Sequence, residues 1–147
     1  MPVEGSRAMR LAVLHAYPPL MLLVVVGNAA LALWAAGADI FGHRRTLSPL
    51  FWSVLLVVVA LLALQVASGI LLAVRGGRPG APLHFLYGIL VAAGALIQLG
   101  LRPGGFLRRR VVPDPARANE PRVLALICFT EMALVLRAFM TGGAPPP

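Results

Sequence analysis

The sequence predicts an all-α fold: an integral membrane four-helix bundle whose helices run alternately up and down. The 147-residue chain is 59% hydrophobic and only 12% charged, whereas roughly a quarter of the residues in a soluble domain are charged. Four apolar runs are each long enough to cross a bilayer. The loops between them are short, which favours antiparallel packing of consecutive helices.

A single membrane domain is expected to cover residues 1–147. Its first apolar run covers about 11–36 and contains Pro18 and Pro19, so a continuous helix can begin near Pro18. The arginines before this run and the small residues after it are also features of a signal peptide. The run is about twice the usual apolar core of such a peptide, so we expect it to be retained as a membrane span.

The other spans are expected at about 48–74, 82–101 and 123–140. The second and third organise the chain, because they flank a tight turn rich in Gly and Pro. The polar Gln65 lies within the second span, and His84 opens the third. The longest loop, residues 102–122, is strongly basic.

All 13 basic residues are arginines, and the formal net charge is +8. A basic membrane protein needs no nucleic acid as a partner, because anionic lipid headgroups beside the loops account for the charge. The first and third loops, residues 37–47 and 102–122, contain more arginines than the N-terminal segment and the second loop. The positive-inside rule therefore predicts that these two loops are cytoplasmic and both termini outside, in a cell (inner) membrane.

His15 and His84 are the main candidates for chemistry. They open the first and third helices, which run parallel in an up-down bundle, so their imidazoles are expected at equal depth near the outer face. Two single histidines placed in this way can ligate the iron of one haem, whereas no HxxxH or HxxE spacing favours a zinc or di-iron centre. Gly88, four residues after His84, leaves room for a porphyrin. The alternative is that small residues only let helices pack closely, without a cofactor.

The motifs around these histidines resemble those of a known family. A Q-x-x-x-G run from Gln65 to Gly69 is followed by a proline-containing turn and an H-x-x-x-G run from His84 to Gly88. With Leu14-His15 before the first helix, this pattern resembles four-helix membrane b-type cytochromes, namely the cytochrome b561-like proteins and one half of haem A synthase. The resemblance covers about residues 14–94. It implies that His15 and His84 bind one haem b.

The fourth helix holds two charged residues, which are costly in lipid. Glu131 and Arg137 are six residues apart and point to different sides of the helix, so each is expected to have its own partner. Arg137 reaches the depth of the histidines, where it can bind haem propionates or a lipid phosphate, or extend to the interface. Glu131 is expected to form a structural hydrogen bond with Gln65, Gln98 or Asn28, in preference to serving a proton path.

The remaining motifs narrow the function without deciding it. The single Cys128 excludes an internal disulfide. No Ser-His-Asp order, Walker motif or dinucleotide fingerprint occurs, so no catalytic residue is assigned and enzymatic activity stays open.

One hypothesis is a cytochrome that uses one b-type haem for electron transfer, with a quinol as a possible partner, or for haem handling. The alternative is a non-catalytic accessory subunit of a larger respiratory or other membrane complex. A transporter or channel ranks third, because little polar lining is available.

Overall fold

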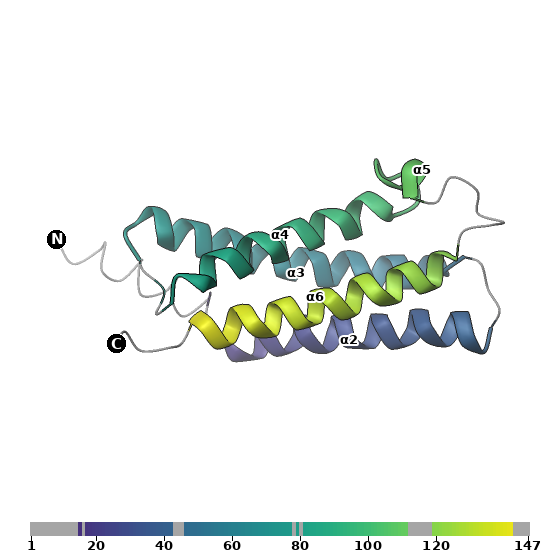
Figure 1. Cartoon of the computed structure of the whole chain (residues 1–147), viewed down its shortest axis with the longest axis horizontal. Coiled ribbons are helices and arrows are strands. Elements are labelled where there is room, and N and C mark those ends of the chain that lie inside the picture. Colours follow the sequence, from purple (N-terminus) through teal and green to yellow (C-terminus); the bar gives the residue numbers. More distant parts are fainter. Residues whose placement is uncertain are drawn as a thin grey trace.

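Four long helices form an antiparallel bundle in the computed structural model, which describes residues 15, 17–42, 46–77, 79, 81–111 and 119–142 (Figure 1). The predicted fold class is therefore confirmed. Over these residues the elements are α2 (Pro18–Ile40), α3 (Pro49–Val74), α4 (Leu83–Leu101), the short α5 (Arg108–Val111) and α6 (Glu120–Gly142). His43 and the start of the predicted first span, residues 11–14, lie outside the described residues.

The continuous first helix begins at Pro18, as the proline pair predicts, and continues four residues past the predicted end at 36. Proline is favourable at a helix start because its missing N–H has no helical acceptor to lose there. Extension to Ile40 places Asp39 in the last turn of α2. The fourth long helix begins at Glu120 instead of 123, and its first residue anchors that end of the bundle.

Local sequence explains how α3 begins and ends. The Ser48 hydroxyl accepts a hydrogen bond from the backbone N–H of Phe51, at 3.3 Å, and Pro49 occupies the first turn. At the other end Gly76 adopts a φ of +84°, which an L side chain disfavours. The N–H of Gly77 then donates to the carbonyl of Leu72, at 2.9 Å, and closes the helix.

Each long helix packs closely against two neighbours, whereas the backbones of the diagonal pairs, α2 with α4 and α3 with α6, lie further apart. The packing of α6 against α2 and α4 is closer than that of α3 against the same two helices. Large apolar side chains fill the centre, among them Leu31, Phe51, Leu55, Leu62 and Leu124. This packing places the starts of α2 and α4 and the end of α6 at one end of the bundle (Figure 1).

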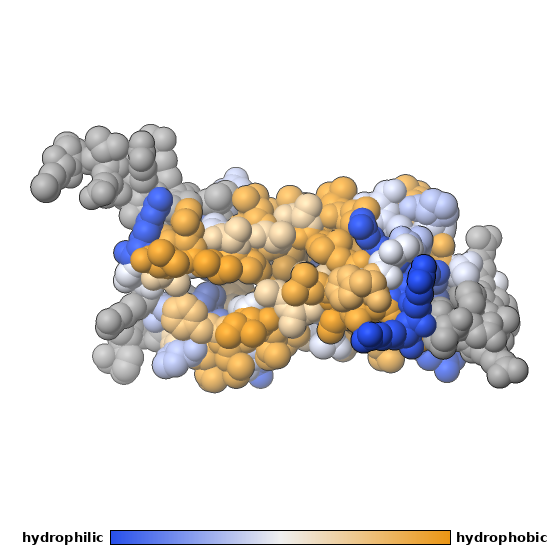
Figure 2. Space-filling model, turned by 90° about the horizontal axis from the view of Figure 1, so that it is seen from above, coloured by the Kyte–Doolittle hydropathy of each residue, from blue (hydrophilic) through white to orange (hydrophobic). Residues whose placement is uncertain are grey.

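The outside of the bundle is apolar over most of its length (Figure 2). Large side chains such as Leu33, Ile89 and Leu126 are more than half exposed. All four long helices are long and apolar enough to cross a membrane. The protein is thus a small multi-pass membrane protein, and its apolar outer surface suits contact with lipid.

A polar cluster closes the end that carries α5. The buried Glu120 carboxylate forms an ion pair with Arg108 and accepts the backbone N–H of Leu47, at 2.9 Å. The Arg108 guanidinium also lies 5.7 Å from the centre of the Trp52 ring, within the range of a cation–π interaction. These contacts join the predicted basic loop 102–122 to the starts of α3 and α6.

Candidate functional site: the histidine pair

His15 and His84 meet at the end of the bundle opposite α5. Their ring centroids are 5.7 Å apart and their ring planes are nearly perpendicular, at 88°. His15 precedes α2 and His84 lies in the first turn of α4. Because α2 and α4 run in the same direction, the two imidazoles lie at the same depth, and the structure brings together the two residues that the sequence singled out.

Each imidazole is held through its Nδ1 atom by a backbone carbonyl of a different helix. His15 Nδ1 lies 3.0 Å from the Gln65 carbonyl oxygen of α3 and 3.3 Å from Ser68 Oγ. His84 Nδ1 lies 2.9 Å from the Ala138 carbonyl oxygen of α6. A carbonyl oxygen only accepts, so each Nδ1 carries the hydrogen and each Nε2 of a neutral ring keeps its lone pair.

This tautomer is the one that metal-binding histidines use, with Nδ1–H donating to a fixed acceptor and Nε2 facing the metal. Among the residues that the structure describes, neither Nε2 accepts a hydrogen bond. Burial lowers the pKa of His15, the Gln65 carbonyl opposes this shift and His84 adds to it. The dominant effect is desolvation, which keeps the ring neutral and therefore able to act as a ligand.

Two glycines that the sequence analysis did not assign to the site make room for the rings. A Cβ atom on Gly69 would lie 2.7 Å from His15 Cε1, and a Cβ on Gly142 would lie 2.9 Å from His84 Cε1. Gly69 closes the Q-x-x-x-G motif, which was the available sequence signal. The predicted Gly88 supports neither ring, and a Cβ built there meets no atom within 4 Å.

The spacing of the two rings is close to that of two imidazoles that bind one metal ion. Two imidazoles on one metal, with nitrogen–metal distances of about 2 Å, have ring centres roughly 6 Å apart, which is close to the observed 5.7 Å. Perpendicular planes are compatible with this because each ring can rotate about its own metal–nitrogen axis. No group of three or more His, Cys, Asp or Glu side chains forms a metal site in the described part of the chain. Two imidazoles alone supply only half of the four ligands that a structural zinc site has.

Arg137 lies on α6 next to Ala138, and hence at the depth of the histidine pair. Its side chain is exposed, and it forms no ion pair with any described residue. The guanidinium thus lies at the outer surface of α6 beside the site, where an anionic group can reach it.

The other predicted polar residues occupy different positions. Gln65 is only half-buried, and its backbone carbonyl, not its side chain, holds His15. Gln98 is fully buried and donates Nε2 to Asn28 Oδ1, at 2.9 Å, and to Cys128 Sγ, at 3.6 Å. The Gln98 amide nitrogen donates to Asn28 and Cys128 and not to Glu131, and Glu131 Oε1 has no hydrogen-bond partner among the described residues.

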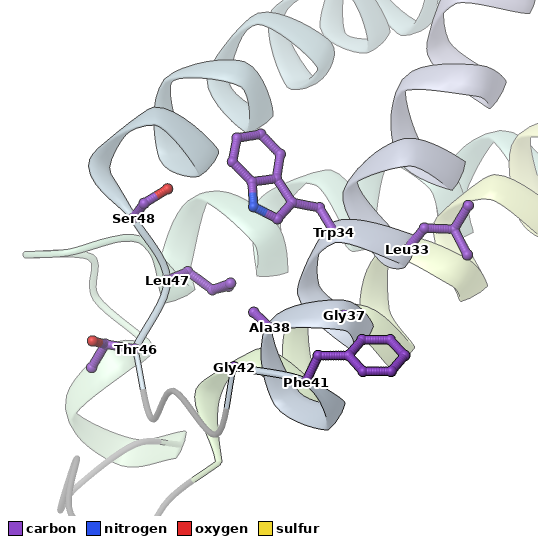
Figure 3. A pocket seen from close by; sticks show the side chains of 9 residues that line it. All are labelled: Leu33, Trp34, Gly37, Ala38, Phe41, Gly42, Thr46, Leu47 and Ser48. Carbon is purple, nitrogen blue, oxygen red and sulfur yellow. The ribbon is translucent and has the colours of Figure 1, made fainter.

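A groove of about 450 Å³ opens beside the end of α2 and the start of α3 (Figure 3). Trp34 and Phe41 provide apolar walls, and Thr46 and Ser48 provide hydroxyl groups. This groove lies at the end of α2 away from the histidines (Figure 1). It is therefore separate from the histidine site.

Comparison of the chain with protein-family models, with curated proteins and with solved structures finds no match.

Proposed function

We propose that this protein is a small membrane cytochrome that binds one b-type haem between His15 and His84. The observation that carries this proposal is the orientation of both imidazoles, each with Nδ1 on a backbone carbonyl and with ring centres 5.7 Å apart. A haem in this position supplies reversible one-electron transfer, with a quinol or a partner protein as the donor or acceptor. The protein's own part is to hold the ligands and exclude water.

Three further features support a haem over a simple pair of stacked histidines. The two candidate ligands come from the segment before α2 and from α4, and each is held by a backbone carbonyl of a further helix, α3 or α6. Gly88 leaves open space on the His84 side of α4. Arg137, at the same depth, is available to bind a propionate, and its long side chain can reach one from the surface.

The proposed orientation places the histidine end at the outer face of the cell membrane. The exposed arginines Arg102, Arg109 and Arg110 then lie on the cytoplasmic side, as the positive-inside rule requires. Electron exchange through this site would take place near the outer surface.

A reduced-minus-oxidised spectrum of the purified full-length protein tests the proposal. We expect a b-type haem band near one haem per chain, and its loss in His15→Ala and in His84→Ala. His43→Ala is the matched control and should keep the band. Because an alanine variant can lose the band by misfolding, His84→Gly should regain it when free imidazole is added. A folded wild-type protein expressed with adequate haem supply but showing no band would overturn the proposal.

The second candidate is an accessory subunit of a larger membrane complex. The observation that favours it is the group of exposed arginines in and beside α5, namely Arg102, Arg109 and Arg110. They contribute to a strongly hydrophilic surface at that end of the bundle (Figure 2). Such a surface suits an acidic partner. Purification in mild detergent tests it: co-purifying subunits in the absence of a haem band support this candidate, and a lone monomer opposes it.

A further inference from the structure

The middle of the bundle contains a polar cluster that the histidine site does not use. Asn28 of α2, Gln98 of α4 and Glu131 of α6 are at most 1% exposed. Cys128, one turn before Glu131, is also buried and accepts a hydrogen bond from Gln98. Two oxygens in this cluster, Gln98 Oε1 and Glu131 Oε1, have no hydrogen-bond partner among the described residues.

The two glutamates of α6 are equally buried, but only one of them has polar partners. Glu120 and Glu131 are both 1% exposed, and they are three helical turns apart, so they lie on the same face of α6. Glu120 is paired with the Arg108 guanidinium and accepts a backbone N–H. Among the described residues, Glu131 has neither kind of partner. A buried carboxylate without a counter-charge or donor is costly, and binding a proton removes that cost.

The position of the Glu131 side chain is set by Gly94 of α4. A Cβ atom on Gly94 would lie 1.8 Å from Glu131 Oε2, so the carboxyl group occupies the space that the missing side chain leaves. Gln98 lies one turn further along the same face of α4. The carboxyl therefore faces the stretch of α4 that carries the second unpartnered oxygen.

No charged side chain approaches Glu131 from the neighbouring helices. In their central turns α2 presents Asn28, α4 presents Gly94 and Gln98, and α3 has no charged residue along its length. On α6 itself the nearest titratable neighbour is Cys128, and Arg137 is six residues away on a different side of the helix. The site thus offers acceptors and no positive charge.

We propose that Glu131 forms a proton-binding site in the middle of the bundle, where the carboxyl group is protonated at neutral pH. The acid O–H donates towards Gln98 Oε1, directly or through one water molecule, which supplies both orphan oxygens with a hydrogen-bond partner. A metal cation fits less well, because hard cations take about six or more oxygen ligands and only two oxygens here lack a partner. This site is independent of haem binding.

Infrared spectroscopy of the full-length protein in liposomes tests the proposal, whether or not the protein binds haem. At pH 7 we expect the carbonyl stretch of a protonated carboxylic acid, shifted in D₂O. An exposed glutamate, with a pKa of about 4.3, is ionised at that pH. The band should disappear in Glu131→Gln and persist in Glu120→Gln, which alters the paired carboxylate on the same helix.

A second variant covers the case in which Glu131→Gln does not fold. Gln98→Leu keeps the carboxyl group and removes its acceptor, so the band should remain and move to the higher frequency of a less hydrogen-bonded acid. The proposal is overturned if the wild-type protein shows no such band at pH 7, or if the band is unchanged in Glu131→Gln. It is also overturned if added Na⁺ replaces the acid band with a carboxylate band, which would identify a cation site.

Discussion

Gly69 of α3 lies against the imidazole of His15, so close that a Cβ atom on Gly69 would come within 2.7 Å of Cε1. The ring is confined between this glycine and the carbonyl of Gln65, one turn earlier on the same helix. The orientation of a residue that precedes α2 is thus decided by α3, more than fifty residues later in the chain.

Gly69→Ala is expected to displace the His15 ring and lower the haem content of the purified protein several-fold. The helix itself gains from the change, since alanine is favoured over glycine in a helix by about 1 kcal/mol. The ratio of haem to protein measures the effect. Gly37→Ala in α2 is the matched control, because a Cβ there meets no atom within 4 Å. Equal haem content in both variants would contradict the assigned role of Gly69.

Gly88→Leu tests whether a cofactor occupies the space beside Gly88, without disturbing the packing of the bundle. A Cβ at Gly88 meets nothing within 4 Å, so a larger side chain there should leave thermal stability in detergent nearly unchanged. If the porphyrin lies along this side of α4, the leucine occupies its place and the haem band should weaken. Unchanged haem content in a stable Gly88→Leu protein would place the porphyrin elsewhere.

The stability of the histidine end is expected to fall at acid pH. Burial is the main reason that the pKa of His15 lies below its usual value of 6.5, so the unfolded chain binds this proton at a higher pH than the folded protein does. The contribution of the neutral His15 ring to the free energy of unfolding is complete above pH 6.5. It is lost as the pH falls from 6.5 towards the lowered pKa of the folded protein. Thermal unfolding followed between pH 8 and 5 should show this loss, and His15→Gln should reduce it.

Glu120→Ala is expected to destabilise the opposite end of the bundle by about 3–5 kcal/mol, the usual cost of removing one partner of a buried ion pair. The change leaves the Leu47 N–H without its acceptor and Arg108 without its counter-charge. Glu120→Gln keeps an acceptor for the N–H and should cost less. Unfolding measured in mixed detergent compares the variants, and equal losses would show that the backbone bond contributes little.

The Asn28–Gln98 bond can be measured by a double-mutant cycle. Each single change to leucine leaves a buried polar partner unsatisfied and should cost about 1–3 kcal/mol. The double variant should cost less than the sum of the two, because both polar groups are removed together. Additive losses in the free energy of unfolding would mean that the two amides are not coupled.

Much of the fold was predictable because each apolar run is as long as a bilayer is thick. The composition, the four runs and the proline- and glycine-rich loops predict four spanning helices in the order found. Boundaries were less predictable: α2 continues to Ile40, and α6 starts at Glu120. At those ends the helix is extended by contacts from other segments, such as the pairing of Asp39 with Arg122, at 3.1 Å.

The meeting of His15 and His84 was predictable, and the contacts that hold the two rings were not. Parallel helices place His15 and His84 at one depth, which follows from topology alone. The sequence does not show which backbone carbonyl accepts the hydrogen bond from each Nδ1–H. It also pointed to Gly88 as the glycine beside the histidines, whereas Gly69 and Gly142 are the glycines that lie against the rings. It also assigned a hydrogen bond to Glu131, whose Oε1 has no partner among the described residues.

The sequence by itself determined that four segments of this chain are long and apolar enough to cross a membrane, because the length and hydropathy of a segment are properties of that segment alone. Only the tertiary structure decided which way each imidazole turns and which buried glutamate has a partner. Those outcomes depend on the rotation of one helix against another, to which side chains far apart in the chain all contribute.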